Sequence, residues 1–108
     1  MKGDKLGEFE EFALLAVYAL KDGTYGVPIQ QHMEKYTGRV VTMGAVYAAL
    51  TRLEEKGYVR SMLGDATPVR GGKRKRQYEP TAAGIKALQA LKRVRERIWQ
   101  TIESRGRA

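Results

Sequence analysis

The sequence predicts a mainly α-helical protein that carries one β-hairpin and ends in a long helix. Four segments have apolar residues at intervals of three and four, which is the period of an amphipathic helix. Two short segments with β-branched or aromatic residues flank a stretch that holds Pro68 and two adjacent glycines, as expected of a hairpin with its loop. A chain of 108 residues with 43% apolar content can form a single core.

The first two predicted helices span 8–20 and 27–36. The acidic residues in the first turn of the first helix suit the positive end of a helix dipole. In the second helix Pro28 falls in the first turn, where it is tolerated, and Gly38 ends the helix. The predicted apolar stripe of the first helix is Phe9, Phe12, Leu15, Ala16 and Ala19, widened by Leu14, Val17 and Leu20. In the second helix the predicted core face is Ile29, Met33 and Tyr36.

A third helix is predicted over about 43–56. Thr42 is a good N-cap, Gly57 suits the C-terminal end, and Val46, Leu50 and Leu53 line one face. The β-branched run at 39–41, just before this helix, suggests a further small strand.

Strands predicted at 58–63 and 76–79 form the hairpin, joined by a loop at 64–72. A last helix is predicted over 82–104 with Thr81 as its cap. The order of three helices, hairpin and helix is that of a winged helix-turn-helix, in which the hairpin is the wing. We therefore expect a DNA-binding domain at 1–80 and a dimerisation helix at 81–108.

The long last helix carries an apolar stripe that the rest of so small a domain cannot cover. Pairing with a second copy of the chain is the simplest way to bury it. Trp99 lies beside the stripe, where it either packs in the interface or forms one wall of a pocket for a planar apolar ligand. The predicted dimer interface is Phe9, Phe12, Leu88, Leu91, Val94, Ile98, Trp99 and Ile102.

The charge favours a polyanionic partner. The net charge is +8, and cations crowd the stretches 70–76 and 86–107. The first stretch falls on the hairpin, where each cation could neutralise a phosphate of double-stranded DNA. A solvated turn, or a contact with RNA or a membrane, would also explain a basic hairpin.

The third helix could enter the major groove, since its face opposite the core has small side chains that allow a close approach to bases. An ordinary helix with a bland solvent face would look similar. The predicted DNA contacts are Thr42, Met43, Gly44, Ala45, Tyr47, Ala48, Thr51 and Arg52 from the helix, and Arg70, Lys73, Arg74 and Lys75 from the wing.

Other function classes find little support. The absence of cysteine excludes thiolate metal sites and disulfides, and it suits a reducing cytoplasm, where a DNA-bound regulator would lie on the nucleoid. No apolar run is long enough to span a bilayer, and no secretory signal pattern is present. The sequence shows no catalytic triad, carboxylate pair or phosphate-binding loop, and His32 stands alone. We expect no cofactor, no metal and no enzymatic activity.

Six short segments resemble the PadR family of transcriptional regulators. They are Leu6–Glu10, Tyr25–Val27, Gly44–Tyr47, Leu53–Val59, Gly71–Tyr78 and Thr81–Gly84, and they occur in the family's order. The resemblance implies a winged helix-turn-helix, a homodimer, usually repression, and in many members a response to small phenolic or drug-like effectors. It also implies that Tyr47 and the 73–76 segment contact DNA. A winged-helix module that binds proteins without DNA is the alternative function.

Overall fold

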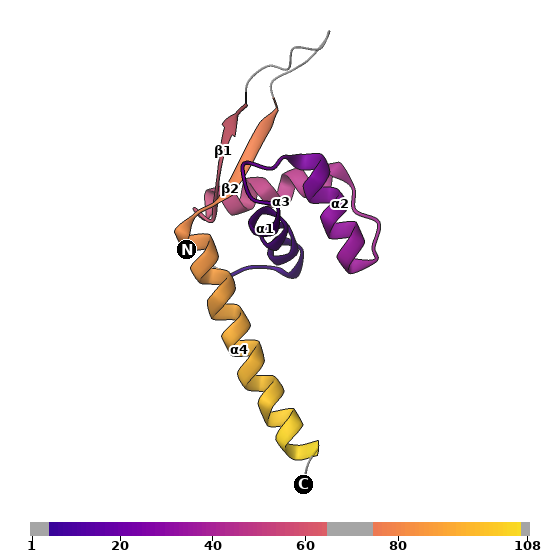
Figure 1. Ribbon diagram of the computed structural model, residues 1–108, viewed down its shortest axis with the longest axis vertical. Coiled ribbons are helices and arrows are strands. Elements are labelled where there is room, and N and C mark those ends of the chain that lie inside the picture. Colours follow the sequence, from indigo (N-terminus) through magenta and orange to yellow (C-terminus); the bar gives the residue numbers. More distant parts are fainter. Residues whose placement is uncertain (1–4, 65–74, 107–108) are drawn as a thin grey trace.

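The computed structural model describes residues 5–64 and 75–106 (Figure 1). Three helices, α1 (Glu8–Leu20), α2 (Gly26–Thr37) and α3 (Met43–Glu55), precede the antiparallel strands β1 (Val59–Leu63) and β2 (Arg76–Pro80), and the long helix α4 (Ala82–Gly106) follows. The predicted fold class, mainly helical with a hairpin wing, is confirmed. The helix and strand bounds differ from the predicted ones by at most two residues.

The core lies between α1, α2 and α3. In α1 the fully buried apolar residues are Leu14, Ala16 and Val17, which belong to the predicted stripe, and Ala13, which does not. Leu15 and Ala19 are exposed, so this part of the prediction is wrong, while Phe9 and Phe12 are partly buried and pack against the core. On α2, Ile29 and Met33 are buried as predicted, but Tyr36 is 68% exposed.

The turn between α2 and α3 is held by side chains of α2. Gln30 donates a hydrogen bond to the carbonyl of Val41 at 2.7 Å, and the Val41 amide donates to the Glu34 carboxylate at 2.9 Å. These side chains satisfy the backbone groups that strand pairing would have used. The small strand predicted over 39–41 is therefore wrong, and the segment is irregular.

The connection between α1 and α2, rather than residues 39–41, adds a third backbone segment beside the hairpin. Thr24 forms an isolated antiparallel bridge with Tyr78, whose amide donates to the Thr24 carbonyl at 2.7 Å. Tyr78 pairs with Ser61 of β1 on its other side, so the buried centre of β2 has a backbone neighbour on both sides. The wing thus begins on a rigid base that is joined to the helical core.

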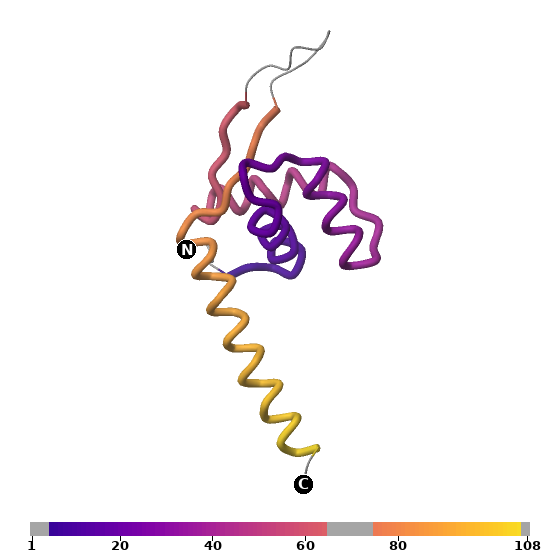
Figure 2. The backbone as a smooth tube through the Cα atoms, viewed as in Figure 1, coloured from indigo at the N-terminus to yellow at the C-terminus, as the bar shows by residue number. Residues whose placement is uncertain are grey.

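The first half of α4 attaches it to this body. The Thr81 hydroxyl accepts a hydrogen bond from the Gly84 amide, which confirms the predicted cap, and donates one to the Gly57 carbonyl at 2.6 Å. Within α4 only Gly84 and Leu88 are buried. The rest of the helix leaves the body and gives the molecule its elongated shape of 65 × 32 × 23 Å (Figures 1 and 2).

Candidate nucleic-acid interface

Of the small residues predicted for the exposed face of α3, Gly44 and Ala48 are exposed and Ala45 is half-buried. Gly44, Tyr47, Ala48, Thr51 and Arg52 are exposed, whereas Val46, Ala49, Leu50 and Leu53 are fully buried. A Cβ built on Gly44 would meet nothing within 4 Å, so this position opens onto free space. The surface allows the helix backbone to approach another molecule closely.

The start of α3 carries no negative charge. The Thr42 hydroxyl caps the helix by accepting the Ala45 amide at 3.1 Å, and the first turn holds no acidic residue. The positive end of the helix dipole is therefore uncompensated by a carboxylate on the helix itself. Such an end favours an anion nearby.

Tyr47 packs against the start of α2 and remains 46% exposed. A Cβ at the buried Gly26 would lie 2.6 Å from the Tyr47 hydroxyl oxygen and 2.9 Å from Cε of Met43. No larger residue fits there unless these side chains shift. Gly26 therefore leaves the space between α2 and α3 that the Tyr47 hydroxyl and the Met43 methyl group occupy.

Two predicted contacts of α3 have partners within the chain. The Thr51 hydroxyl donates to the Tyr47 carbonyl at 2.9 Å, and Arg52 Nε donates to the carboxylate of Glu10 at 2.6 Å. Arg52 nevertheless keeps 47% of its side chain exposed. Their contact with DNA stays a prediction.

The buried Glu10 was missed at the sequence level, where it counted only as a first-turn acid. Its carboxylate lies between Arg52 and Lys56, whose Nζ is 2.5 Å away. Burial raises the pKa of Glu10, but the hydrogen bonds from Lys56, Arg52 and the Gly7 amide outweigh it, so the pKa lies below its ordinary value. Glu10 thus joins the start of α1 to the last turns of α3.

Only one of the four cations predicted for the wing falls in the described part of the chain. Lys75 is exposed, and its ammonium lies 4.2 Å from the centroid of the Tyr25 ring. Arg70, Lys73 and Arg74 lie outside the described residues. On the strands themselves, Arg60 pairs with Glu79 at 3.1 Å and Arg76 donates to the Ser61 hydroxyl at 3.0 Å.

The predicted dimer stripe of α4 is largely exposed in the single chain. Leu88 is buried and Leu91 half-buried, whereas Val94, Ile98, Trp99 and Ile102 are 41%, 55%, 60% and 53% exposed. A groove of about 470 Å³ runs along the half-buried part, lined by Lys5, Leu6, Tyr58, Ala87, Ala90, Leu91 and Val94. Apolar side chains therefore lie uncovered over most of the helix.

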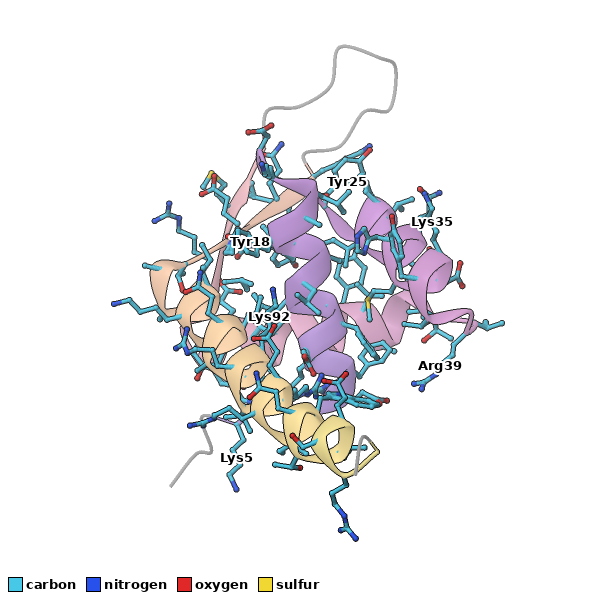
Figure 3. The ribbon with its side chains drawn as sticks, turned by 60° about the horizontal axis from the view of Figure 1, so that its bottom comes forward. Lys5, Tyr18, Tyr25, Lys35, Arg39 and Lys92 are labelled. Atoms are coloured by element: carbon cyan, nitrogen blue, oxygen red, sulfur yellow. The ribbon has the colours of Figure 1, made fainter. Side chains whose placement is uncertain are left out.

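A second groove, of about 530 Å³, separates α1 from α4 and includes Trp99. Leu15 and Tyr18 line it from α1, and Leu88, Lys92 and Arg95 from α4 (Figure 3 labels Tyr18 and Lys92). Arg95 crosses the groove to the buried carboxylate of Glu11, which it binds through two hydrogen bonds of 2.9 and 2.7 Å. The groove thus combines apolar side chains with a charged pair.

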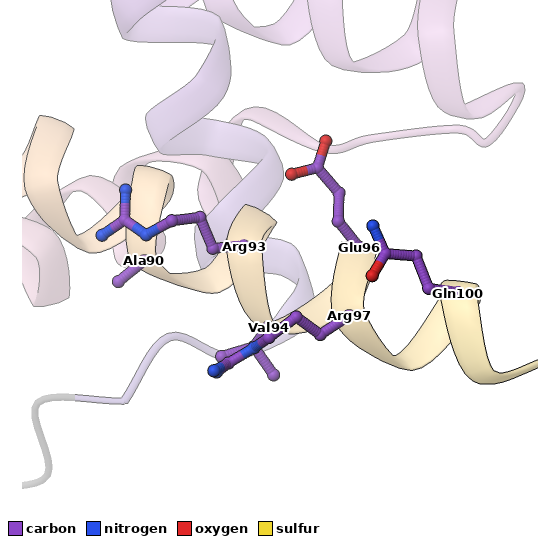
Figure 4. Close-up of a pocket in the computed structure, with 6 residues that line it drawn as sticks. All are labelled: Ala90, Arg93, Val94, Glu96, Arg97 and Gln100. Atoms are coloured by element: carbon purple, nitrogen blue, oxygen red, sulfur yellow. The ribbon is translucent and has the colours of Figure 1, made fainter.

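A third surface hollow, of about 390 Å³, lies on α4 alone (Figure 4). Its lining residues, Ala90, Arg93, Val94, Glu96, Arg97 and Gln100, all come from this one helix, so it is a shallow surface rather than a site between elements.

Neither a metal site nor a membrane span is found in the described ranges. In residues 5–64 and 75–106, no three His, Cys, Asp or Glu side chains lie close enough to hold a metal ion together. The half-buried His32 packs its ring against Tyr36, with centroids 4.7 Å apart. Over the same ranges, no helix is both long and apolar enough to cross a membrane.

Solved structures share this fold along nearly the whole chain. A PadR family transcription regulator from Clostridium difficile superposes with a TM-score of 0.72 at 21% identity, covering 91% of this chain and 97% of that one. A PadR-like transcriptional regulator from Bacillus cereus gives 0.69 at 19% identity, covering 92% and 91%. A transcriptional regulator from Clostridium thermocellum gives 0.68 at 24% identity, covering 89% and 87%.

The family assignment rests on a comparison of the sequence with protein-family models. No curated protein matches the chain by sequence. The family model described as "Transcriptional regulator PadR-like family" matches residues 14–90, from α1 through the wing into α4. Because the match spans most of the chain, the protein belongs to the PadR-like family of transcriptional regulators.

Proposed function

We propose that this chain is a homodimeric repressor that inserts α3 into the major groove of a pseudo-palindromic operator. The observation that carries the proposal is the exposed face of α3, which has no acidic side chain from Gly44 to Thr51. This face begins at the N-terminal end of the helix, where the helix dipole is positive. Small residues there leave room for base edges, and the Tyr47 hydroxyl lies at the flank, where phosphates would run. In this scheme α3 is the recognition helix.

The wing supplies affinity that does not depend on sequence. Its segment 70–76 holds five Lys or Arg residues, which would neutralise phosphates and release counterions. The division of labour follows that of other winged helices: the recognition helix selects bases, and the wing fixes the protein on the duplex. Residues 1–80 would form the DNA-binding unit, acting in the cytoplasm on the nucleoid.

The dimer is proposed from the uncovered stripe of α4. Burying Val94, Ile98 and Ile102, each about half exposed, against the same residues of a second copy removes apolar surface that the single chain cannot cover. In helix-turn-helix dimers the two recognition helices enter successive major grooves about 34 Å apart, and we propose the same spacing here. Phe9 and Phe12 lie at the start of α1 and would extend the interface.

The experiment is a binding titration and footprint on the DNA upstream of the protein's own gene. We expect protection of two half-sites whose centres are about one helical turn apart. Replacing Lys73, Arg74 and Lys75 by glutamine should weaken binding to every duplex and lower the salt slope of the dimer by about five, because three cations are lost from each of its two wings. Neutralising Lys35, Lys86 and Arg93 removes the same charge away from the wing and serves as the control.

Two results of this experiment would contradict the proposal. If wild-type protein protects no sequence at low salt, the alternative function, a winged helix that binds other proteins, is favoured instead. If the wing variant keeps both its affinity and its salt slope, the wing does not contact the duplex.

A planar apolar effector is a second candidate function of the α1–α4 groove. Trp99, at 60% exposure, lines the same groove as Leu15 and Tyr18, and an exposed indole can stack on a flat ligand. Quenching of Trp99 fluorescence across a panel of aromatic compounds tests this, because the chain has one tryptophan. A flat response to the whole panel would remove the effector and leave Trp99 as a packing residue.

A further inference from the structure

A side-chain contact joins the base of the wing to the start of α2. Lys75, the residue before β2, places its ammonium 4.2 Å from the centroid of the Tyr25 ring, and Tyr25 is the residue before α2. A cation over a tyrosine face is attracted by the negative face of the ring. The lysine keeps three N–H donors, so the ring can hold the ammonium while a donor still reaches an anion.

The backbone on both sides of this contact is fixed. The Gly64 amide donates to the Lys75 carbonyl at 2.7 Å and closes the base of the wing. On the other side, Thr24 is bridged to Tyr78 of β2, so Tyr25 directly follows a residue that is paired with the wing. The contact between ring and ammonium therefore joins two anchored segments.

Tyr25 also leads into the contact between α2 and the recognition helix. The next residue, Gly26, is covered by Tyr47 and Met43 of α3 so closely that a Cβ would collide with both. A continuous series of contacts thus runs from Lys75 through Tyr25 and Gly26 to Tyr47. Figure 3 shows Tyr25 at the side of the molecule away from α4, where the strands end.

We propose that Tyr25 is a positioning residue for DNA binding: its ring holds the Lys75 ammonium beside the exposed face of α3, so that the wing base and the recognition helix meet one duplex together. The proposal rests on the DNA-binding function proposed above. A free lysine loses rotamer freedom when it contacts a phosphate, and a lysine already held in place loses less. The ring face is what matters here, and the hydroxyl is not required.

The test uses the full-length protein with the variants Tyr25→Phe, Tyr25→Leu, Lys75→Gln and the Tyr25→Leu/Lys75→Gln pair. The probe is a labelled mixed-sequence duplex of about 30 base pairs, titrated at several salt concentrations, since phosphate contacts do not depend on sequence. We expect Tyr25→Phe to bind like wild type and Tyr25→Leu to bind about two- to five-fold more weakly. Lys75→Gln should lower the salt slope by about two, one for each subunit of the proposed dimer, and adding Tyr25→Leu to it should change nothing further.

Three results would overturn the positioning role. Equal weakening by Tyr25→Phe and Tyr25→Leu would mean that the hydroxyl itself contacts DNA. The same weakening by Tyr25→Leu with and without Lys75 would mean that Tyr25 supports the fold and acts independently of the wing. Wild-type binding by Tyr25→Leu would mean that the contact has no effect.

A measurement without DNA covers the case in which Tyr25→Leu folds poorly. The ε-methylene protons of Lys75 should resonate upfield in wild type, because they lie in the shielding cone of the ring, and ordinary shifts would overturn the contact. A wild-type protein that binds no duplex at low salt contradicts the proposed function itself. The variant results in a protein that does bind concern Tyr25 alone.

Discussion

Arg95 on α4 binds the carboxylate of Glu11 on α1, and its two terminal nitrogens donate hydrogen bonds of 2.9 and 2.7 Å. The two residues are 84 positions apart in the sequence. Glu11 is almost completely buried, with 9% of its side chain exposed. Beyond Leu88 no residue of α4 is buried, so this paired contact is the outermost firm attachment of α4 to the body. The pair therefore fixes the direction in which α4 leaves the DNA-binding unit.

Removing the guanidinium should loosen α4. In Arg95→Ala the Glu11 carboxylate stays buried with its partner lost, which costs up to several kcal/mol for a fully buried pair. Because Arg95 is 53% exposed, we expect a smaller loss, about 1–2 kcal/mol in the free energy of unfolding. Urea unfolding at one fixed protomer concentration measures it, since dimerisation would add to the apparent stability.

Arg39→Ala is the matched control for this loss. It breaks the ion pair between Arg39 and Glu8 at 3.0 Å, in which both side chains are more than 60% exposed. Exposed pairs contribute about 0–1 kcal/mol, so this variant should unfold almost as wild type does. Equal losses in the two variants would contradict the role of the Glu11–Arg95 pair in holding α4.

The lowered pKa of Glu10 predicts how the protein responds to acid. A carboxyl group whose pKa is lower in the folded state adds stability above its unfolded pKa, about 4.3. That contribution is lost as the pH falls through the lowered folded pKa. The free energy of unfolding should therefore decrease below about pH 4.5, and Glu10→Gln should reduce this decrease.

Unfolding curves for wild type and Glu10→Gln at neutral and acidic pH check the prediction. The gap between the two proteins should be widest near pH 7, because there the ionised carboxylate binds Lys56 and Arg52, and it should narrow toward about pH 3. Glu8→Gln, at an exposed ion pair, is the control and should track wild type. A constant gap at every pH would show that the glutamine acts by packing and not by charge.

Periodicity and turn residues were enough to predict the order of the elements, because each helix has its own apolar stripe and its own cap or glycine stop. They did not narrow the wide apolar stripe of α1 to its buried part. The stripe, from Phe9 to Leu20, occupies more than one face, and only the packing of three helices buries Ala13, Leu14 and Val17 while leaving Leu15 exposed.

The burial of two acidic residues of α1 could not be predicted for a related reason. Glu10 and Glu11 look like ordinary first-turn acids, and their partners Arg52, Lys56 and Arg95 are distant in sequence. The exposed face of α3 was predictable because one helix determines it. The contact of Lys75 with Tyr25 was not, since it depends on how the wing is anchored to Thr24.

Gly84 should tolerate no side chain. A Cβ at this buried position in the first turn of α4 would collide with the backbone carbonyl of Tyr58, which is fixed by the Thr81 amide at 3.0 Å. Gly84→Ala should therefore destabilise the protein by about 2–3 kcal/mol, despite the better helix propensity of alanine. Gly106→Ala, with open space around its Cβ, is the control. Wild-type stability of Gly84→Ala in thermal unfolding would contradict this close approach of α4.

At Gly44, a substitution should raise stability and weaken DNA binding. Gly44 lies in the first turn of α3 and its Cβ would meet nothing within 4 Å, so alanine should stabilise the helix by up to about 1 kcal/mol. If the start of α3 lies against base edges in the complex, the added methyl group occupies space that the bases need. Gly44→Ala should then bind the protected operator about ten-fold more weakly while melting at a higher temperature.

The control for this variant is Gly7→Ala, which also adds a methyl group in open space but lies at the start of α1. It should leave operator affinity unchanged. Gly44→Ala protein with raised stability and wild-type affinity would mean that the start of α3 stands away from the bases. Major-groove contacts would then have to come from Tyr47, Ala48 and Thr51 further along the helix, and the proposed docking would need to be tilted accordingly.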